Sequence, residues 1–259
     1  RASINQFGER CAAPSTGDVG VVLVVTDLAS RDWAAVGAQL AAQPGISGVW
    51  ANVNAQKTNA VLGPETVHLA GAEALTDSVR GVPLDRSPTS FFQTNHRGME
   101  ALLELIEDML PPAFDQWVDL YAGGGLFTAA FGQRAQERTL VESNPDAVAS
   151  ARATLQACGM VANVIEGRVD EHMDSVPMGA DVVILDPPRS GAGEATLRAL
   201  AARAPSQLIY VSCRPTALVR DLAVLATLGY QTAEVRSVDM FPHTPHLEAV
   251  ARLAAPAGR

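Results

Sequence analysis

Several features that identify other classes of protein are absent from this chain of 259 residues. No apolar run approaches the roughly 20 residues that a membrane-spanning helix needs, and no stretch near the start combines basic residues, an apolar core and a small-residue cleavage site. The three cysteines, Cys11, Cys158 and Cys213, have neither metal-ligand spacing nor the even number of a disulfide framework. We therefore expect no membrane segment, no metal site and a cytoplasmic setting, where thiols stay reduced.

Lysine is also nearly absent. Lys57 is the only one, and the formal net charge is −9. A protein that grips nucleic acid over its whole surface carries an excess of basic residues. The composition excludes that class, although it leaves room for a local cleft lined by arginine.

The sequence shows two different patterns of strand-like and helix-like runs, one in residues 1–90 and the other in residues 91–259. Residues 1–90 contain runs in the order strand, helix, strand, strand, which predicts a smaller α+β domain. In residues 91–259, strand-like and helix-like runs alternate. Such alternation predicts an α/β domain with a doubly wound, Rossmann-like and mostly parallel sheet, covered by helices on both faces. Ligands of these folds bind beyond the carboxyl ends of the strands.

The first of these strand ends carries glycines without a phosphate-binding motif. Gly123 to Gly125 follow the strand-like "WVDLY", but neither G-x-G-x-x-G nor G-x-x-x-x-G-K-[ST] is present. The next strand-like run ends in Glu142, whose carboxylate can bind the hydroxyls of a ribose. This combination favours S-adenosylmethionine as the ligand. The alternative is a tight turn without a ligand, a common use of glycine.

Two further strand-like runs end in residues that can do chemistry. Asp186 ends "ADVVILD" and is followed by two prolines, which make a rigid, extended bend. Cys213 ends "SQLIYVSC", directly before Arg214 and a helix-like run that begins with proline. We expect Arg214 and the helix N-terminus to make the thiol reactive by favouring its ionised form. The alternative is a cysteine that only packs in the core.

Six segments, in this order, resemble the RNA 5-methyluridine methyltransferases, an S-adenosylmethionine-dependent family that acts on tRNA and ribosomal RNA. They are "FFQTN" (91–95), "DLYAGGGLFT" (119–128), "VESNPDAV" (141–148), "LDPPRSG" (185–191), "YVSCRPTALVRDL" (210–222) and "DMFPHTPHLEAV" (239–250). The start of the last segment, "DMFPHT", is closer to the ribosomal RNA members. Residues 46–90 resemble the family's central region more loosely.

The resemblance implies roles for individual residues. Cys213 would be the nucleophile that attacks C6 of the target uracil, and Glu248 the base that removes the proton from C5. The residues implied at the cofactor site and its junction with the base are Gln93, Tyr121, Glu142 and Asp186, beside the turn glycines Gly123 and Gly125. We expect the RNA to contact few arginines, chiefly Arg189 and Arg214, with Arg97 and Arg220.

The chemistry agrees with these roles. C5 of uracil is a poor nucleophile until a thiolate adds at C6, and a carboxylate must then remove the C5 proton. Glu248 lies in the apolar run "HLEAVARL", where a buried acid without a partner would be costly. The predicted function is therefore methylation of uracil C5 in RNA by a monomer, with 23S ribosomal RNA favoured over tRNA.

Two alternatives remain. The "DPP" motif also occurs in enzymes that methylate amino groups, but a nitrogen acceptor needs no thiol. A methyltransferase-like module that binds RNA without activity is the other. Some family members carry an iron–sulfur cluster held by four cysteines, and with Cys11 alone upstream of the catalytic region no such cluster can form within this chain.

Three residues depart from the family pattern. Arg214 stands where an asparagine often follows the nucleophile. Leu126 stands where an asparagine often contacts the methionine part of the cofactor, and Arg168 where a polar or acidic contact to the cofactor is common. These departures concern how the cofactor is held rather than the class of reaction.

Overall fold

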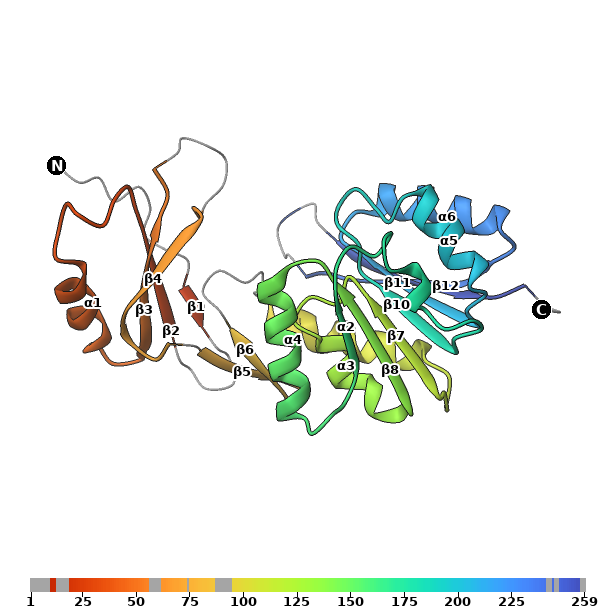
Figure 1. Ribbon diagram of the computed structural model, residues 1–259, viewed down its shortest axis with the longest axis horizontal. Helices are drawn as coiled ribbons and strands as arrows, with labels where there is room; N and C mark the ends of the chain where they lie inside the picture. The colour runs from red at the N-terminus through yellow and green to blue at the C-terminus, as the bar shows by residue number, and fades with distance from the viewer. Residues whose placement is uncertain are drawn as a thin grey trace. The chain divides into compact units, whose positions relative to one another are not determined.

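The computed structural model describes residues 10–12, 19–55, 62–73, 75–86, 95–240, 244 and 247–256. The chain divides into two compact units, which are coloured by residue number in Figure 1. One unit comprises Arg1–Ser78 and Pro83–Thr94, and the other comprises Val79–Val82 and Asn95–Arg259. Within the described residues, no helix combines the length and the apolar character needed to cross a membrane.

The first unit contains a four-stranded sheet in the order β1-β2-β3-β4. Its strands are β1 (Arg10–Ala12), β2 (Val19–Val25), β3 (Ile46–Val53) and β4 (Glu65–Gly71). Helix α1 (Trp33–Ala41) connects β2 to β3 and packs against β3 and β4. This is the smaller α+β portion that the sequence predicts. A two-stranded sheet, β5 (Leu75–Val79) and β6 (Val82–Arg86), follows it.

The second unit is built on a seven-stranded sheet in the order β12-β13-β11-β10-β7-β8-β9. Its strands are β7 (Gln116–Leu120), β8 (Glu137–Glu142), β9 (Asn163–Glu166), β10 (Val182–Leu185), β11 (Gln207–Ser212), β12 (Gln231–Val238) and β13 (Glu248–Ala254). Its α-helices are α2 (His96–Met109), α3 (Leu126–Phe131), α4 (Pro145–Ala157), α5 (Glu194–Ala202) and α6 (Pro215–Thr227), with short 3-10 turns at Gly132–Arg134 and Met173–Ser175.

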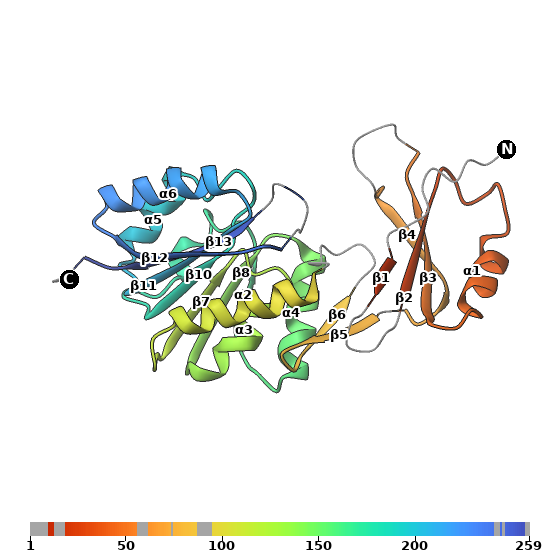
Figure 2. The ribbon, with the colours of Figure 1, turned by 180° about the vertical axis from the view of Figure 1, so that it is seen from behind.

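Helices cover both faces of this sheet. Figures 1 and 2 show α5 and α6 on one face and α2, α3 and α4 on the other. Beneath α5 and α6, the core contains fully buried strand residues such as Val183, Leu185 and Leu208, packed with Leu197 and Leu218 of the helices. The five neighbouring strands β11, β10, β7, β8 and β9 are parallel to one another. The doubly wound, Rossmann-like sheet predicted from the alternating pattern is confirmed.

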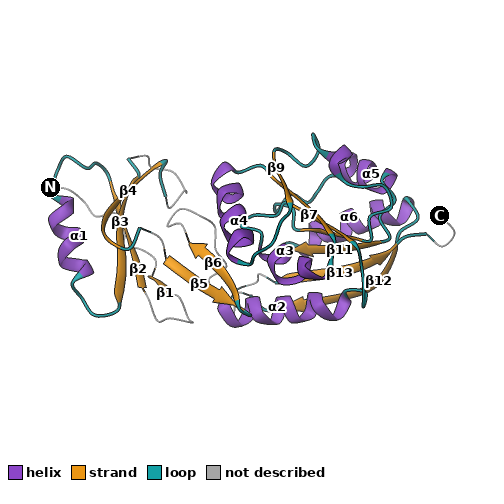
Figure 3. Ribbon diagram, turned by 60° about the horizontal axis from the view of Figure 1, so that its bottom comes forward, coloured by secondary structure: helices purple, strands orange, loops and turns teal. Residues whose placement is uncertain are grey.

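One strand was not expected from the sequence. β13 is inserted between β11 and β12 and runs antiparallel to both, as Figure 3 shows for the strands of this sheet. Its sequence, "EAVARLA", is short and mostly buried. A short apolar run of this kind has no period that separates a buried strand from a buried helix. Its place in the sheet follows from pairing with partners far away in the sequence.

Candidate active site

The parallel strands end in one row of functional residues. Leu185 of β10 pairs with Leu120 of β7, and Leu120 pairs with Val141 of β8. The next residue of each strand is therefore Asp186, Tyr121 and Glu142. The register continues into this row, because the N–H of Asp186 donates to the carbonyl oxygen of Leu120 at 3.3 Å. The sheet thus brings together three residues that the sequence assigns to one site.

Glu142 is held against the glycine-rich turn. Its Oε2 accepts a hydrogen bond from the N–H of Gly123 at 2.9 Å, and its Oε1 accepts one from the N–H of Asn144 at 2.7 Å. Gly123 and Gly125 adopt φ values of +52° and +78°, which residues with a side chain rarely adopt. Glycine is therefore favoured at both positions of the turn that leads into α3.

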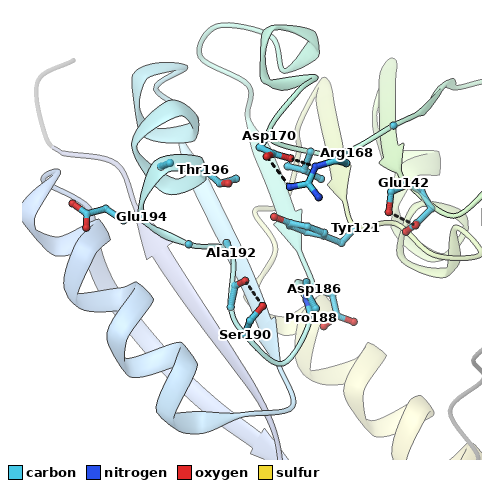
Figure 4. Close-up of a pocket in the computed structure, with 16 residues that line it drawn as sticks. Tyr121, Glu142, Arg168, Asp170, Asp186, Pro188, Ser190, Ala192, Glu194 and Thr196 are labelled. Carbon is cyan, nitrogen blue, oxygen red and sulfur yellow. Dashed lines mark hydrogen bonds and ion pairs between the residues drawn. The ribbon is translucent and has the colours of Figure 1, made fainter. Parts of the chain in front are cut away.

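A pocket of about 700 Å³ opens beside this row. The residues that line it are Tyr121, Glu142, Ser143, Gly167, Arg168, Val169, Asp170, Asp186, Pro188, Ser190, Gly191, Ala192, Gly193, Glu194, Ala195 and Thr196. Figure 4 shows Tyr121 at its centre, with Glu142 and Asp186 close by. Of the predicted cofactor residues, Gly123 and Gly125 lie in the adjoining turn, and Gln93 lies outside the described residues.

Two charged residues of the pocket pair with each other. Nε and Nη2 of Arg168 donate to Oδ1 and Oδ2 of Asp170 at 3.0 and 2.9 Å (Figure 4). The hydrogen bond from Arg168 lowers the pKa of the Asp170 carboxyl. Arg168, which departs from the family pattern, thus favours the ionised form of Asp170 in the wall of the pocket. Both oxygens of Asp170 already accept hydrogen bonds from the Arg168 guanidinium.

The thiol and the predicted base come from neighbouring strands. β11 and β13 are antiparallel, and Ser212 pairs with Ala249. One step further in the same register, Cys213 lies opposite Glu248. Residues directly opposite each other in such a pair project to the same face of the sheet. The insertion of β13 is therefore what brings Glu248 beside Cys213.

Glu248 is a buried acid without a hydrogen-bond partner for one of its oxygens. Its relative exposure is 2%, and within the described part of the chain nothing donates to its Oε2. Burial, assisted by the negative charge of Asp186, raises the pKa of Glu248 to about 8. An acid in this state can exchange a proton near neutral pH.

The Cys213 thiol is half-buried, and its pKa is raised rather than lowered. The causes are burial and then the charges of Glu248 and Asp186, while a hydrogen bond from the Arg189 side chain acts in the opposite direction. Our expectation for Arg214 and α6 was wrong in this respect. The Arg214 side chain is exposed, and the guanidinium that reaches the thiol comes from the loop after β10.

Asp186 connects the two groups of residues. It lines the pocket, and its charge acts on both Cys213 and Glu248. Burial raises the pKa of Asp186 to about 7. Asp186 therefore belongs both to the pocket and to the surroundings of Cys213 and Glu248.

Sequence reasoning missed a buried carboxylate behind the turn. Asp119 in β7 is 1% exposed, and its Oδ2 accepts from Oγ1 and N–H of Thr128 at 2.7 and 3.2 Å. Burial raises the pKa of Asp119 to about 7. The contact anchors the first turn of α3, and an acid inside the apolar run "WVDLY" was the available signal.

Two protein families match parts of the chain. Residues 168–255 match the family described as tRNA (Uracil-5-)-methyltransferase. Residues 93–209 match the family described as methyltransferase small domain. The first match contains Cys213 and Glu248, and the second contains the row of strand ends.

Similar proteins extend over most of the chain. An uncharacterized RNA methyltransferase of Thermosynechococcus vestitus is 37% identical over 81% of this chain and 47% of its own length. One of Listeria innocua is 32% identical over 92% of this chain and 54% of its own length. The chain thus spans about half the length of the curated relatives that it matches.

A solved structure shares the fold of both units. The tRNA (uracil-54, C5)-methyltransferase of Pyrococcus abyssi, in complex with S-adenosyl-L-homocysteine, superposes with a TM-score of 0.80 and 28% identity, over 93% of this chain and 58% of that one. The family matches, the named relatives and this fold agree. The chain has the fold of the S-adenosylmethionine-dependent methyltransferases, and its sequence is similar to RNA methyltransferases of the tRNA (uracil-5-)-methyltransferase type.

Proposed function

We propose that this chain methylates C5 of uracil in RNA through a covalent bond between Cys213 and C6 of the base. The observation that carries the proposal is the register of β11 and β13, in which Ser212 pairs with Ala249, so that the next residue, Cys213, lies near the buried carboxylate of Glu248. Asp186 lies between this pair and the pocket. Such a constellation suits the methylation of a carbon atom that is not itself nucleophilic.

The pocket fits a nucleoside with a charged, flexible substituent. The Glu142 carboxylate, fixed by the turn, has acceptor capacity left for ribose hydroxyls. Tyr121 offers an aromatic face, and Asp186 offers a carboxylate near the thiol end of the pocket. S-adenosylmethionine supplies the methyl group when it is bound there.

Cys213 and Arg189 would carry out the first step. The positive charge of Arg189 favours the thiolate against burial and two neighbouring carboxylates. The thiolate forms a bond to C6, and the electrons of the C5–C6 double bond move to C5 and the adjoining carbonyl. C5 thereby becomes nucleophilic enough to accept a methyl group.

Glu248 would complete the reaction. After methylation, C5 carries both a methyl group and a proton. The free Oε2 of Glu248 takes this proton, the C5–C6 double bond re-forms, and the sulfur leaves as a thiolate. The proton then passes from Glu248 to water, which returns the site to its starting state.

Two other functions account for less of the site. A nitrogen acceptor would use Asp186 and the prolines after it, but it would leave the paired Cys213 and Glu248 without a role. An inactive RNA-binding module would gain nothing from a buried acid whose pKa is raised to about 8, because an unpartnered buried acid costs stability.

The class of RNA is a narrower proposal. The sequence "DMFPHT" favours 23S ribosomal RNA, whereas the similar Pyrococcus abyssi enzyme is named for a tRNA. Either substrate would put the enzyme in the cytoplasm. Mass mapping of 5-methyluridine in both RNA fractions from cells with and without the gene would distinguish the two.

The adduct provides the direct test of the mechanism. Cys213→Ala should abolish methylation of RNA while calorimetry with S-adenosylhomocysteine stays nearly unchanged, because the thiol does not line the pocket. Glu248→Gln should still permit attack and methyl transfer, and then stall because the C5 proton cannot leave. The stalled species is a protein–RNA adduct that survives denaturing electrophoresis.

The double variant Cys213→Ala, Glu248→Gln is the matched control and should give no adduct. Near-normal turnover by Cys213→Ala would contradict the thiol mechanism outright. An inactive Glu248→Gln that leaves no adduct would remove only the role proposed for Glu248.

A further inference from the structure

The loop between β10 and α5 serves both halves of the site. Pro188 and Ser190 to Gly193 line the pocket, and the positive charge of Arg189, between them, favours the ionised form of the Cys213 thiol. A displacement of this loop would therefore disturb the cofactor pocket and the nucleophile together. What holds the loop is a set of side chains that do not line the pocket themselves.

Asp221 of α6 is the centre of this set. Its side chain is 1% exposed. Its Oδ2 accepts a hydrogen bond from the hydroxyl of Tyr210 at 2.6 Å and another from the N–H of Ala192 at 2.8 Å. The Tyr210 oxygen also lies 3.1 Å from the Ala192 nitrogen and accepts from the same N–H. One backbone N–H of the loop is thus held by a carboxylate and a hydroxyl at once.

The second oxygen of Asp221 extends the contact along the loop. Nε and Nη2 of Arg220 donate to Oδ1 of Asp221 at 3.0 and 2.8 Å, and Nη2 also donates to the carbonyl oxygen of Ser190 at 2.6 Å. Asp221 and Arg220 therefore hold the backbone on both sides of Gly191.

Gly191 shows how closely the loop lies against these groups. Its φ is +84°, and a Cβ at this position would lie 2.5 Å from both Nη2 of Arg220 and Oδ2 of Asp221. Only glycine allows the backbone to approach the ion pair so closely. The Arg220 side chain is 58% exposed, and an ion pair with one exposed partner adds little to stability. The contacts that this pair makes to one loop therefore call for a reason other than stability.

We propose that Asp221, Tyr210 and Arg220 are positioning residues, which hold the 188–193 loop so that Arg189 reaches the Cys213 thiol and the pocket keeps its wall. The functional meaning of the thiol rests on the function proposed above. The positioning itself does not, because thiol reactivity and ligand affinity can be measured without any RNA.

Tyr210→Phe is the sharpest test, because it removes one hydroxyl and keeps the buried ring. The rate of Cys213 alkylation by iodoacetamide, followed by peptide mass mapping across pH, should fall about three- to tenfold at fixed pH, the loss expected when a supporting hydrogen bond is removed. The profile should shift to higher pH as Arg189 loses its hold on the thiolate. Affinity for S-adenosylhomocysteine, measured by calorimetry, should fall by a similar factor.

Tyr230→Phe is the matched control. The Tyr230 hydroxyl is buried as well, but it donates at 2.8 Å to the carbonyl oxygen of Pro205, before the start of β11 and so at the other end of that strand from Cys213. The Tyr230→Phe variant should have a lower free energy of unfolding but the same rate of Cys213 alkylation. The Cys158 peptide in the same digests is the internal reference and should not change in either variant.

Asp221→Asn should lower the alkylation rate and the ligand affinity more than Tyr210→Phe does. It weakens the contact to Ala192 directly and, by loosening Arg220, the contact to Ser190. If Tyr210→Phe matches Tyr230→Phe in both Cys213 alkylation and ligand affinity, the set only stabilises the fold and the proposal is overturned, whether or not Asp221→Asn folds. A wild-type protein that methylates no uracil would refute the proposed function and leave these two measurements unaffected.

Discussion

At the scale of single residues, the site is an arrangement of charges around one thiol. Cys213 has Glu248 and Asp186 as negative neighbours and Arg189 as the positive one. The carboxylates oppose ionisation of the thiol, and the guanidinium favours it. The reactivity of Cys213 therefore depends on a residue of another loop rather than on its own neighbours in the chain.

This arrangement predicts the pH dependence of methylation. Glu248 must be deprotonated to act as a base, and its pKa is raised to about 8. The fraction of competent base thus increases as pH rises through that value, and the raised pKa of the Cys213 thiol acts in the same direction. The turnover number at saturating cofactor should rise between about pH 6.5 and 9.

Asp186→Asn should move this limb of the profile to lower pH, because it removes a negative charge that raises the pKa of both groups. Glu142→Gln is the matched control. It removes another carboxylate of the pocket that does not contribute to the shift of Glu248. The turnover number of Asp186→Asn is measured against pH at saturating cofactor. If it rises over the same pH range as in the wild type, the charge of Asp186 does not control the pKa of Glu248 and Cys213.

The sequence predicts which residues meet where strands that are consecutive in the chain are also neighbours in the sheet. Cys213 and Asp186 end consecutive parallel strands, so their meeting follows from the alternating pattern. Arg214 illustrates the limit. It follows Cys213 in the chain, but the side chain that reaches the thiol belongs to Arg189, 24 positions earlier. Local order does not determine which way a side chain at a helix start will point.

At the scale of elements, the glycine-rich turn is set by backbone conformation. Gly125 is the residue before α3, and a Cβ there would lie 3.2 Å from the Cβ of Ala151 in α4. Its φ of +78° is unfavourable for any residue with a side chain. The same turn presents the N–H of Gly123 to Glu142, so its shape controls the position of the acid.

Gly125→Ala should lower the free energy of unfolding by about 2 kcal/mol or more, from left-handed strain plus crowding against α4. It should also weaken binding of S-adenosylhomocysteine, because the turn moves away from Glu142. Gly159→Ala is the matched control, with φ of +64° and open space around the Cβ. It should cost about 1 kcal/mol in urea unfolding and leave ligand affinity unchanged. Equal losses of affinity in both variants would contradict this account.

Strands and helices were predictable from the sequence wherever an element packs against the element next to it in the chain. "WVDLY", "RTLVES" and "ADVVILD" became β7, β8 and β10 because strand and helix alternate and the crossovers are short. β13 was not predictable in this way. It pairs on both sides through antiparallel ladders with β11 and β12, and only these long-range pairings fix its register and put Glu248 opposite Cys213.

At the scale of the whole molecule, charge limits how RNA can bind. The net charge is −9, so the chain as a whole repels a polyanion, and contacts must be local. Of the four arginines expected to contact RNA, Arg220 is engaged by Asp221 and the Ser190 carbonyl. Arg97, Arg189 and Arg214 are exposed. Few phosphates can therefore be neutralised.

We accordingly expect this chain to bind single-stranded RNA weakly and with a shallow salt dependence. About three phosphate contacts correspond to a slope near −2 in a plot of log K against log salt concentration, since each contact contributes about −0.7. Arg214→Ala should reduce the magnitude of the slope by about one contact, whereas Arg198→Ala, on the exposed face of α5 and paired with Glu194, should leave it unchanged. The slope can be measured by fluorescence anisotropy between 50 and 300 mM salt. A slope steeper than about −5 would mean that many phosphates are neutralised and that a basic surface outside these three arginines carries the RNA.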